Sequence, residues 1–200
     1  AFKPRTSPYS FQGLGVQGLS FLKAAAKAHG LLCVSELLSE DHVDLLANSV
    51  DIIQIGARNM SNFSLLKAAA HTQRPIILKR GMAATYHEWL LAAEYILSEG
   101  NFNVVLCERG IRTFETQTRN TLDLAAVPYL KNVTHLPVIV DPSHGVGVRD
   151  LIPDMALASV ASGAHGIMLE VHTHPDQAYS DAAQTLGIES FAALTGKMQA

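Results

Sequence analysis

Short apolar segments recur along the chain, and longer helix-like segments separate them. The apolar segments are Leu31–Val34, Ile52–Ile55, Ile76–Leu78, Val104–Cys107, Val138–Val140 and Ile167–Leu169. Each is too short for a free-standing helix, and most lack the polar alternation of a half-exposed strand. This pattern is typical of strands that are buried on both faces of a parallel sheet.

The segments between these predicted strands have the composition of helices. They are Val16–Ala28, Ser39–Asn48, Ser61–Ala70, Tyr86–Ser98, Asn120–Leu130, Leu151–Ser162 and Glu189–Met198. Successive strands start roughly 20 to 35 residues apart, which is the expected length of a βα unit. Because no linker, charge block or low-complexity stretch divides the chain, we expect one domain over residues 1–200.

Six strands are fewer than the eight of a closed (β/α)8 barrel, which usually needs about 250 residues. Residues 2–8, Phe-Lys-Pro-Arg-Thr-Ser-Pro, have the composition of a loop that follows a strand. We therefore expect an α/β protein of the (β/α)8 TIM-barrel class, with the first two strand–helix units absent from this chain. An open six-stranded sheet is the alternative.

Composition excludes several classes of protein. A formal net charge of −3 gives no general attraction to nucleic acid. The sequence has no apolar run of 18 residues and no charged-then-apolar leader, so we expect neither a membrane span nor a secretory signal. Cys33 and Cys107 lie inside apolar runs, as buried thiols in a reducing cytoplasm would.

Cationic side chains follow most of the predicted strands and also occur near the amino end. The carboxyl ends of parallel strands lie on one edge of a barrel, where active sites form, so we expect these cations to share one mouth. Arginine binds phosphate or carboxylate in a bidentate manner, and lysine adds a point charge, so the set favours a phosphorylated substrate. Glu36 could simply orient a cation such as Arg58. The cations are Lys3, Arg5, Arg58, Lys79, Arg109 and Arg112.

Three potential metal ligands stand at or just beyond the ends of the last two predicted strands. They are His144, Glu170 and Asp181. One imidazole and two carboxylates suit a divalent ion such as Mn²⁺, Fe²⁺, Co²⁺ or Zn²⁺. Asp141, in Asp-Pro-Ser, could cap a turn beside this group.

Six motifs, in order and over essentially the whole chain, resemble the 3-deoxy-D-arabino-heptulosonate 7-phosphate (DAHP) synthases of the microbial Iβ type. The resemblance implies a (β/α)8 barrel that forms a carbon–carbon bond between phosphoenolpyruvate (PEP) and erythrose 4-phosphate, the first committed step of the shikimate pathway. The motifs are residues 3–13 (KPRTSPYSFQG), 54–59 (QIGARN), 78–81 (LKRG), 107–115 (CERGIRTFE), 141–145 (DPSHG) and 170–172 (EVH).

The same resemblance implies roles for individual residues. Lys3 would lie beside PEP between the two substrates, and Lys3 and His144 would be catalytic. The implied metal ligands are His144, Glu170 and Asp181. The implied substrate-binding residues are Arg5, Thr6, Glu36, Arg58, Lys79, Arg109 and Arg112, with Arg5 and Thr6 on the phosphate of erythrose 4-phosphate.

The chain departs from the family pattern at one metal ligand. The family's cysteine ligand lies in a Gly-Pro-Cys motif, and these 200 residues contain no such motif. Two alternatives therefore stay open. The first is a non-catalytic paralogue or fragment that binds phosphorylated ligands. The second is the sister enzyme 3-deoxy-D-manno-octulosonate 8-phosphate synthase. Lys-Pro-Arg-Thr at residues 3–6 favours the four-carbon sugar over the sister enzyme's substrate. Barrels of this kind often associate, so we expect a homo-oligomer.

Overall fold

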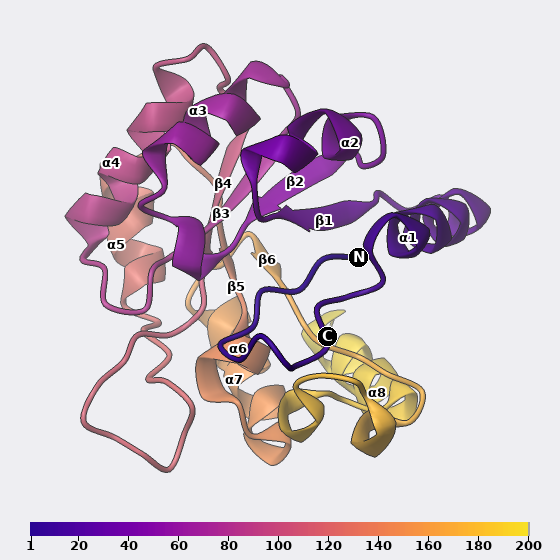
Figure 1. Cartoon of the computed structure of the whole chain (residues 1–200). Coiled ribbons are helices and arrows are strands. Elements are labelled where there is room, and N and C mark those ends of the chain that lie inside the picture. Colours follow the sequence, from indigo (N-terminus) through magenta and orange to yellow (C-terminus); the bar gives the residue numbers. More distant parts are fainter. Residues whose placement is uncertain (200) are drawn as a thin grey trace. The chain divides into compact units, whose positions relative to one another are not determined.

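The computed structural model describes residues 1–199, and its contacts divide the chain into two compact units. The first unit comprises residues 1–81 and 87–105, and the second comprises residues 82–86 and the chain from Leu106 onward. Within the described residues there are six strands, each at or near one of the predicted apolar segments, and the pairings between these strands within a unit are parallel (Figure 1). The fold class predicted from the sequence, α/β with parallel strands, is confirmed.

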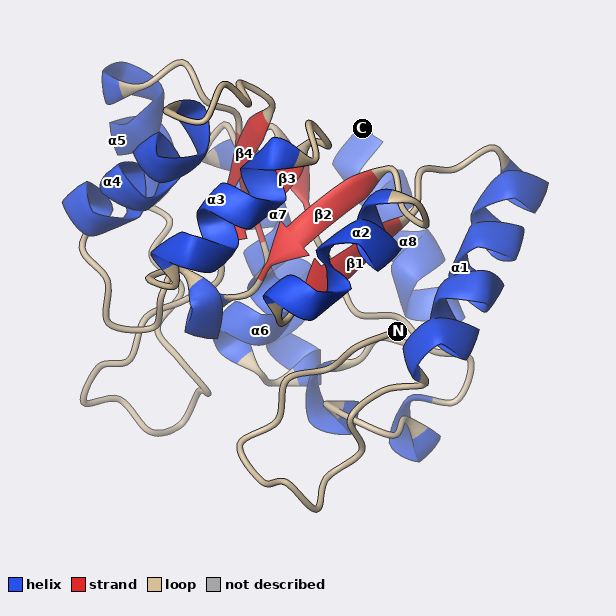
Figure 2. Cartoon of the chain, turned by 45° about the horizontal axis from the view of Figure 1, so that its top comes forward, coloured by secondary structure: helices blue, strands red, loops and turns tan. Residues whose placement is uncertain are grey.

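The first unit contains three paired strands in chain order. They are β1 (Val34–Leu37), β2 (Ile52–Ile55) and β3 (Ile76–Lys79), and β4 (Val104–Glu108) starts in this unit and continues into the second. Figure 2 shows helices beside these strands. The helices are α1 (Gly15–His29), α2 (Val43–Ala47), α3 (Phe63–His71) and α4 (Tyr86–Leu97), with short 3₁₀ turns η1 (Glu40–His42) and η2 (Ala57–Asn59).

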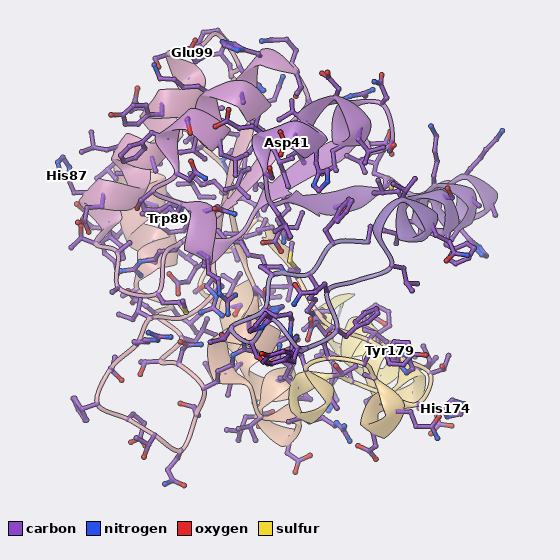
Figure 3. The ribbon with its side chains drawn as sticks, viewed as in Figure 1. Asp41, His87, Trp89, Glu99, His174 and Tyr179 are labelled. Atoms are coloured by element: carbon purple, nitrogen blue, oxygen red, sulfur yellow. The ribbon has the colours of Figure 1, made fainter. Side chains whose placement is uncertain are left out.

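The core of the first unit is built from strand residues and the inner faces of α3 and α4. Ile53, Ile55 and Leu78 are fully buried, as is Trp89 of α4, which Figure 3 labels. The Trp89 indole Nε1 donates to the carbonyl oxygen of Leu78 at 3.2 Å, so the one tryptophan of the chain satisfies its polar atom inside the core. The carboxyl ends of β2 and β3 therefore follow strand segments that are fixed by core packing.

The second unit repeats the alternation of strand and helix. β4 pairs with β5 (Val138–Val140), which pairs with the two-residue β6 (Gly166–Ile167). The helices are α5 (Ala126–Val133), α6 (Pro142–Val146), α7 (Ile152–Ala161) and α8 (Ile188–Gln199), and the 3₁₀ turns are η3 (Arg149–Leu151), η4 (Pro175–Gln177) and η5 (Ala182–Gln184).

Two predicted elements are displaced along the chain. The first strand runs over Val34–Leu37 rather than Leu31–Val34, because α1 extends to His29 and ends in a left-handed Gly30, after which Leu31 and Leu32 are exposed. Ser35 and Glu36 thus lie within a strand and not after it. The helix predicted over Asn120–Leu130 begins only at Ala126, because Thr121 pairs with Ile111 in an antiparallel bridge.

Among residues 1–199, no helix is both long enough and apolar enough to span a membrane. The prediction of one domain stays a prediction.

Candidate metal centre and anion-binding residues

In the first unit, the loop over residues 3–12 closes on itself and contacts the turn after β2. The Lys3 backbone N–H donates to the Gln12 carbonyl oxygen at 2.9 Å. The Arg58 guanidinium, in η2, donates through Nη2 to the Thr6 hydroxyl at 3.3 Å. Two residues predicted to bind substrate phosphates, from segments far apart in sequence, are therefore brought together within this unit.

Glu36 is placed by the parallel register of β1 and β2. Its strand partner is Gln54, and the Gln54 amide donates to Glu36 Oε2 at 3.2 Å. A Cβ on Gly56 would overlap the Glu36 carboxylate, so the backbone after β2 leaves the space that this carboxylate fills. A side chain at this position would displace the Glu36 carboxylate from its present place.

The third cationic position lies at the carboxyl end of β3. Lys79 is the last residue of the strand and is 6% exposed. The next residue, Arg80, is also buried, and its guanidinium lies 6.0 Å from the centre of the Trp89 ring, within the range of a cation–π contact. Charged side chains are rarely buried without a function or a partner, so this strand end is a candidate for anion binding.

In the second unit, Arg109 is buried directly after β4. Burial lowers the pKa of its guanidinium from the usual value, and the nearby Asp141 carboxylate opposes this shift. The guanidinium still stays charged, because arginine does not lose its proton in proteins. Its Nη1 donates to the Gly110 carbonyl oxygen at 3.3 Å and its Nη2 to the His144 carbonyl oxygen at 3.5 Å.

His144 is held by the helix that carries it. Asp141 caps α6, because its Oδ1 accepts from the His144 backbone N–H at 2.9 Å. Its Oδ2 lies 2.7 Å from His144 Nδ1. Since a carboxylate only accepts, Nδ1 carries the proton and Nε2 is left as the nitrogen that can bind a cation. Asp141 is fully buried, and a buried carboxylate behind a histidine is a common support for a metal ligand.

The three predicted metal ligands converge. His144, Glu170 and Asp181 each offer a ligand atom, and these atoms all lie within 4.8 Å of one another. His144 Nε2 is 3.4 Å from Glu170 Oε1. Two atoms that bind one ion at about 2.1 Å each lie about 3 to 3.5 Å apart, so this separation fits a shared cation. One nitrogen and two carboxylate oxygens suit a divalent metal, although they do not select one.

Two polar residues of this cluster were missed by the sequence analysis. The Arg119 Nη1 donates to Asp181 Oδ1 at 2.9 Å and to Gln184 Oε1 at 2.7 Å. The Gln184 Nε2 donates to Glu170 Oε2 at 2.8 Å. The only signal in the sequence was the spacing of Asp181 and Gln184, which places both side chains on one side of a 3₁₀ turn.

Arg112, another residue predicted to bind substrate, is less constrained. Arg112 is exposed, and its backbone N–H donates to the Met82 carbonyl oxygen at 2.7 Å. His172 and His174 are also exposed, with the His172 ring bonded to the His174 backbone, and Figure 3 shows His174 at the outside of its unit. The described residues of the second unit thus concentrate their candidate chemistry at His144, Glu170 and Asp181.

Parallel strands with buried cations at their carboxyl ends in each unit, and a histidine–carboxylate cluster in the second, define a class, namely α/β proteins with candidate anion-binding residues and a candidate divalent-metal centre. The profile of the DAHP synthetase I family matches residues 1–200. The chain belongs to this family.

Individual relatives agree with the family match. Phospho-2-dehydro-3-deoxyheptonate aldolase from Thermotoga maritima is 53% identical over 199 residues, covering 100% of this chain and 59% of the relative. The chain therefore spans about three fifths of that relative's length. The 2-dehydro-3-deoxyphosphooctonate aldolase of Geotalea uraniireducens is more distant, at 30% identity over 98% of this chain and 75% of the relative.

Solved structures give the same picture. The crystal structure of the Thermotoga maritima DAHP synthase superposes with a TM-score of 0.96 and 51% identity, covering 100% of this chain and 58% of that one. A truncated form of the synthase from the same organism gives a TM-score of 0.92 and 49% identity, over 95% of this chain and 72% of that one. The resemblance inferred from the motifs is confirmed.

Proposed function

We propose that this chain carries the catalytic chemistry of a DAHP synthase, in which PEP and erythrose 4-phosphate condense and inorganic phosphate is released. The observation that carries the proposal is the convergence of His144, Glu170 and Asp181 beside a histidine-orienting Asp141. The family match over the whole chain supports it. We also propose that the six strands are those of a (β/α)8 barrel, with two strand–helix units outside these 200 residues.

The proposed substrate contacts follow the motif resemblance. Arg58, Lys79 and Arg109 are assigned to the PEP phosphate, and Arg5 and Thr6 to the phosphate of the sugar. Holding both polyanions in one orientation offsets their mutual repulsion and makes the reaction effectively intramolecular. The hydrogen bond from Arg58 to Thr6 supports this assignment, because it shows that the two proposed phosphate-binding segments of the first unit lie beside each other.

Glu36 and Arg112 complete the proposed contacts with the substrates. Glu36 is a polar neighbour of PEP in this proposal, and its placement by Gln54 and Gly56 supports a fixed position. Arg112, which is exposed, would reach the substrate from the loop after β4.

His144, Glu170 and Asp181 are the proposed ligands of a divalent cation, with Mn²⁺, Fe²⁺, Co²⁺ and Zn²⁺ as candidates. Such an ion would act as a Lewis acid on the aldehyde oxygen of erythrose 4-phosphate. In the overall reaction C3 of PEP bonds to C1 of the sugar, water adds at C2 of PEP, and phosphate leaves. Two hypotheses stand for the proton donor, Lys3 and a water held by the cation, and near-normal turnover of Lys3→Ala with both substrates saturating would rule out the lysine.

Phosphate release from PEP tests the activity directly. The chain would be assayed with and without erythrose 4-phosphate, with Mn²⁺ and again with excess chelator. We expect release that requires both the sugar and the metal, and its loss in His144→Ala. A folded chain that binds PEP and Mn²⁺ but releases no phosphate would contradict catalysis and favour a non-catalytic, ligand-binding relative.

A second candidate is the sister reaction with arabinose 5-phosphate, favoured by the 30% identity to a 2-dehydro-3-deoxyphosphooctonate aldolase. The same assay with arabinose 5-phosphate separates the two. We expect faster turnover with erythrose 4-phosphate, since Lys-Pro-Arg-Thr at residues 3–6 favours the shorter sugar.

The proposed assembly is a homo-oligomer in the cytoplasm. The family supports the assembly, and the two buried thiols, Cys33 and Cys107, which form no disulfide, support a reducing compartment. Sedimentation of the purified chain at several concentrations tests the assembly.

A further inference from the structure

Gln184 occupies a position between two groups of opposite hydrogen-bonding character. On one side the Glu170 carboxylate can only accept, and on the other the Arg119 guanidinium can only donate. The Gln184 amide meets the carboxylate with its Nε2 at 2.8 Å and the guanidinium with its Oε1 at 2.7 Å. A primary amide has one donor end and one acceptor end, so it can bridge this pair, whereas a carboxylate or an ammonium group would face a like partner.

The bridge is rigid on the Gln184 side. Gln184 is 2% exposed and closes the 3₁₀ turn η5, with its backbone N–H donating to the Asp181 carbonyl oxygen at 3.1 Å. The Thr185 hydroxyl donates to the same carbonyl oxygen at 2.9 Å. Asp181 itself has a φ of 54°, in the left-handed region that costs most residues free energy. The turn therefore fixes the Asp181 carboxylate and the Gln184 amide with respect to each other.

The bridge is also supported on the Arg119 side. Gly147 has a φ of 73°, and a Cβ there would overlap the Arg119 side chain at its base. The Arg119 backbone N–H donates to the Val146 carbonyl oxygen at 2.8 Å. Because the stem of Arg119 packs against bare backbone, its guanidinium can reach Asp181 and Gln184 through the same nitrogen.

The bridge holds one oxygen of the Glu170 carboxylate in place. Its Oε2 accepts from Gln184, and its Oε1 lies 3.4 Å from His144 Nε2. The backbone N–H of Glu170 donates to the Ser143 hydroxyl at 3.0 Å, so both ends of the residue are anchored. With Oε2 held by Gln184, Oε1 is the carboxylate oxygen that faces His144 Nε2.

We propose that Gln184 is a positioning residue for the metal centre, whose amide links Glu170 to Arg119 and through it to Asp181, so that both carboxylates are oriented before a divalent cation binds. The inference rests on the proposed function of His144, Glu170 and Asp181 as metal ligands. Outer hydrogen-bond partners of this type typically change metal affinity by about 10- to 100-fold.

The test is metal binding by the 200-residue chain, which needs no turnover. Free Mn²⁺ would be followed by electron paramagnetic resonance during titration, and the d–d absorption of bound Co²⁺ would report the ligand geometry. The variants are Gln184→Met, which keeps the volume and removes both hydrogen bonds, and Gln184→Asn, which keeps the amide but shortens its reach. Gln177→Met is the matched control, since Gln177 is an exposed glutamine nearby in the same unit.

We expect the Mn²⁺ dissociation constant to rise about 10- to 100-fold in Gln184→Met and by a smaller factor in Gln184→Asn, with an altered Co²⁺ spectrum in both and no change in Gln177→Met. Thermal unfolding without metal checks that each variant is folded. If Gln184→Met unfolds at a lower temperature than the parent, the metal affinity of Gln184→Asn is the test of the proposal. Parent-like affinity and spectra in the folded Gln184 variants would overturn the positioning role while leaving the metal centre intact. If the parent and His144→Ala bind Mn²⁺ equally poorly, the proposed metal centre itself is wrong. That result would overturn both the metal centre and the positioning role of Gln184.

Discussion

The substitution Asp141→Asn isolates the support behind His144, because it replaces one carboxylate oxygen by an NH₂ group in a fully buried side chain that makes two separate contacts with His144. Oδ1 accepts the backbone N–H of His144 at 2.9 Å, and Oδ2 faces the ring Nδ1 at 2.7 Å. An asparagine has one acceptor and one donor end, so it can reproduce only one of these contacts.

Each orientation of the asparagine has a distinct cost. If the amide oxygen keeps the cap of α6, the NH₂ group faces Nδ1, and the ring proton moves to Nε2, the nitrogen that faces Glu170. Metal affinity then falls by about 10- to 100-fold, or about 1.4 to 2.8 kcal/mol. If the oxygen faces Nδ1 instead, two donors meet at the helix start, and losing the cap costs about 0.5 to 2 kcal/mol of stability.

Isothermal titration with Mn²⁺ and urea unfolding of the metal-free chain would be measured on the same samples. We expect Asp141→Asn to lose metal affinity, stability, or part of both. Asp51→Asn is the control, because Asp51 also accepts a backbone N–H, that of Cys33 at 2.8 Å, but belongs to the first unit. An Asp141→Asn chain with parent-like affinity and stability, when the parent binds Mn²⁺, would refute this reasoning.

Two further predictions concern stability. Gly147→Ala should lower the free energy of unfolding by about 1 to 3 kcal/mol, because the residue has a positive φ and a Cβ would overlap Arg119; an unchanged urea midpoint would contradict this. Burial, and to a lesser extent the Asp51 carboxylate, raises the pKa of the Cys33 thiol, so the unfolded chain loses that proton at a lower pH than the folded chain. The parent should therefore lose stability with rising pH above about 8.5, where an unperturbed thiol ionises, more steeply than Cys33→Ala; parallel stability–pH curves for the two would show that this thiol does not contribute.

The sequence was sufficient for four of the strands, whose apolar runs are buried or half-buried along their length. The runs at Ile52, Ile76, Val104 and Val138 each became a strand, because such residues lose most by contact with water and the short runs cannot form stable helices. The strand predicted to start at Leu31 was placed wrongly, because Leu31 and Leu32 are exposed apolar residues that follow the end of a helix. Local composition does not distinguish these two cases.

The convergence of His144, Glu170 and Asp181 was also predictable, because residues at or beyond the carboxyl ends of successive parallel strands lie at one edge of the sheet. Their supports were not. Gln184 and Arg119 are 65 positions apart, and their hydrogen bond at 2.7 Å exists only once the chain is folded. The donor and acceptor types of side chains are fixed by the sequence, but which donor meets which acceptor is fixed by packing. The sequence by itself thus determined the class of fold and the candidate ligands His144, Glu170 and Asp181, and the tertiary structure decided which partners, Gln184 and Arg119, form hydrogen bonds with the two carboxylates.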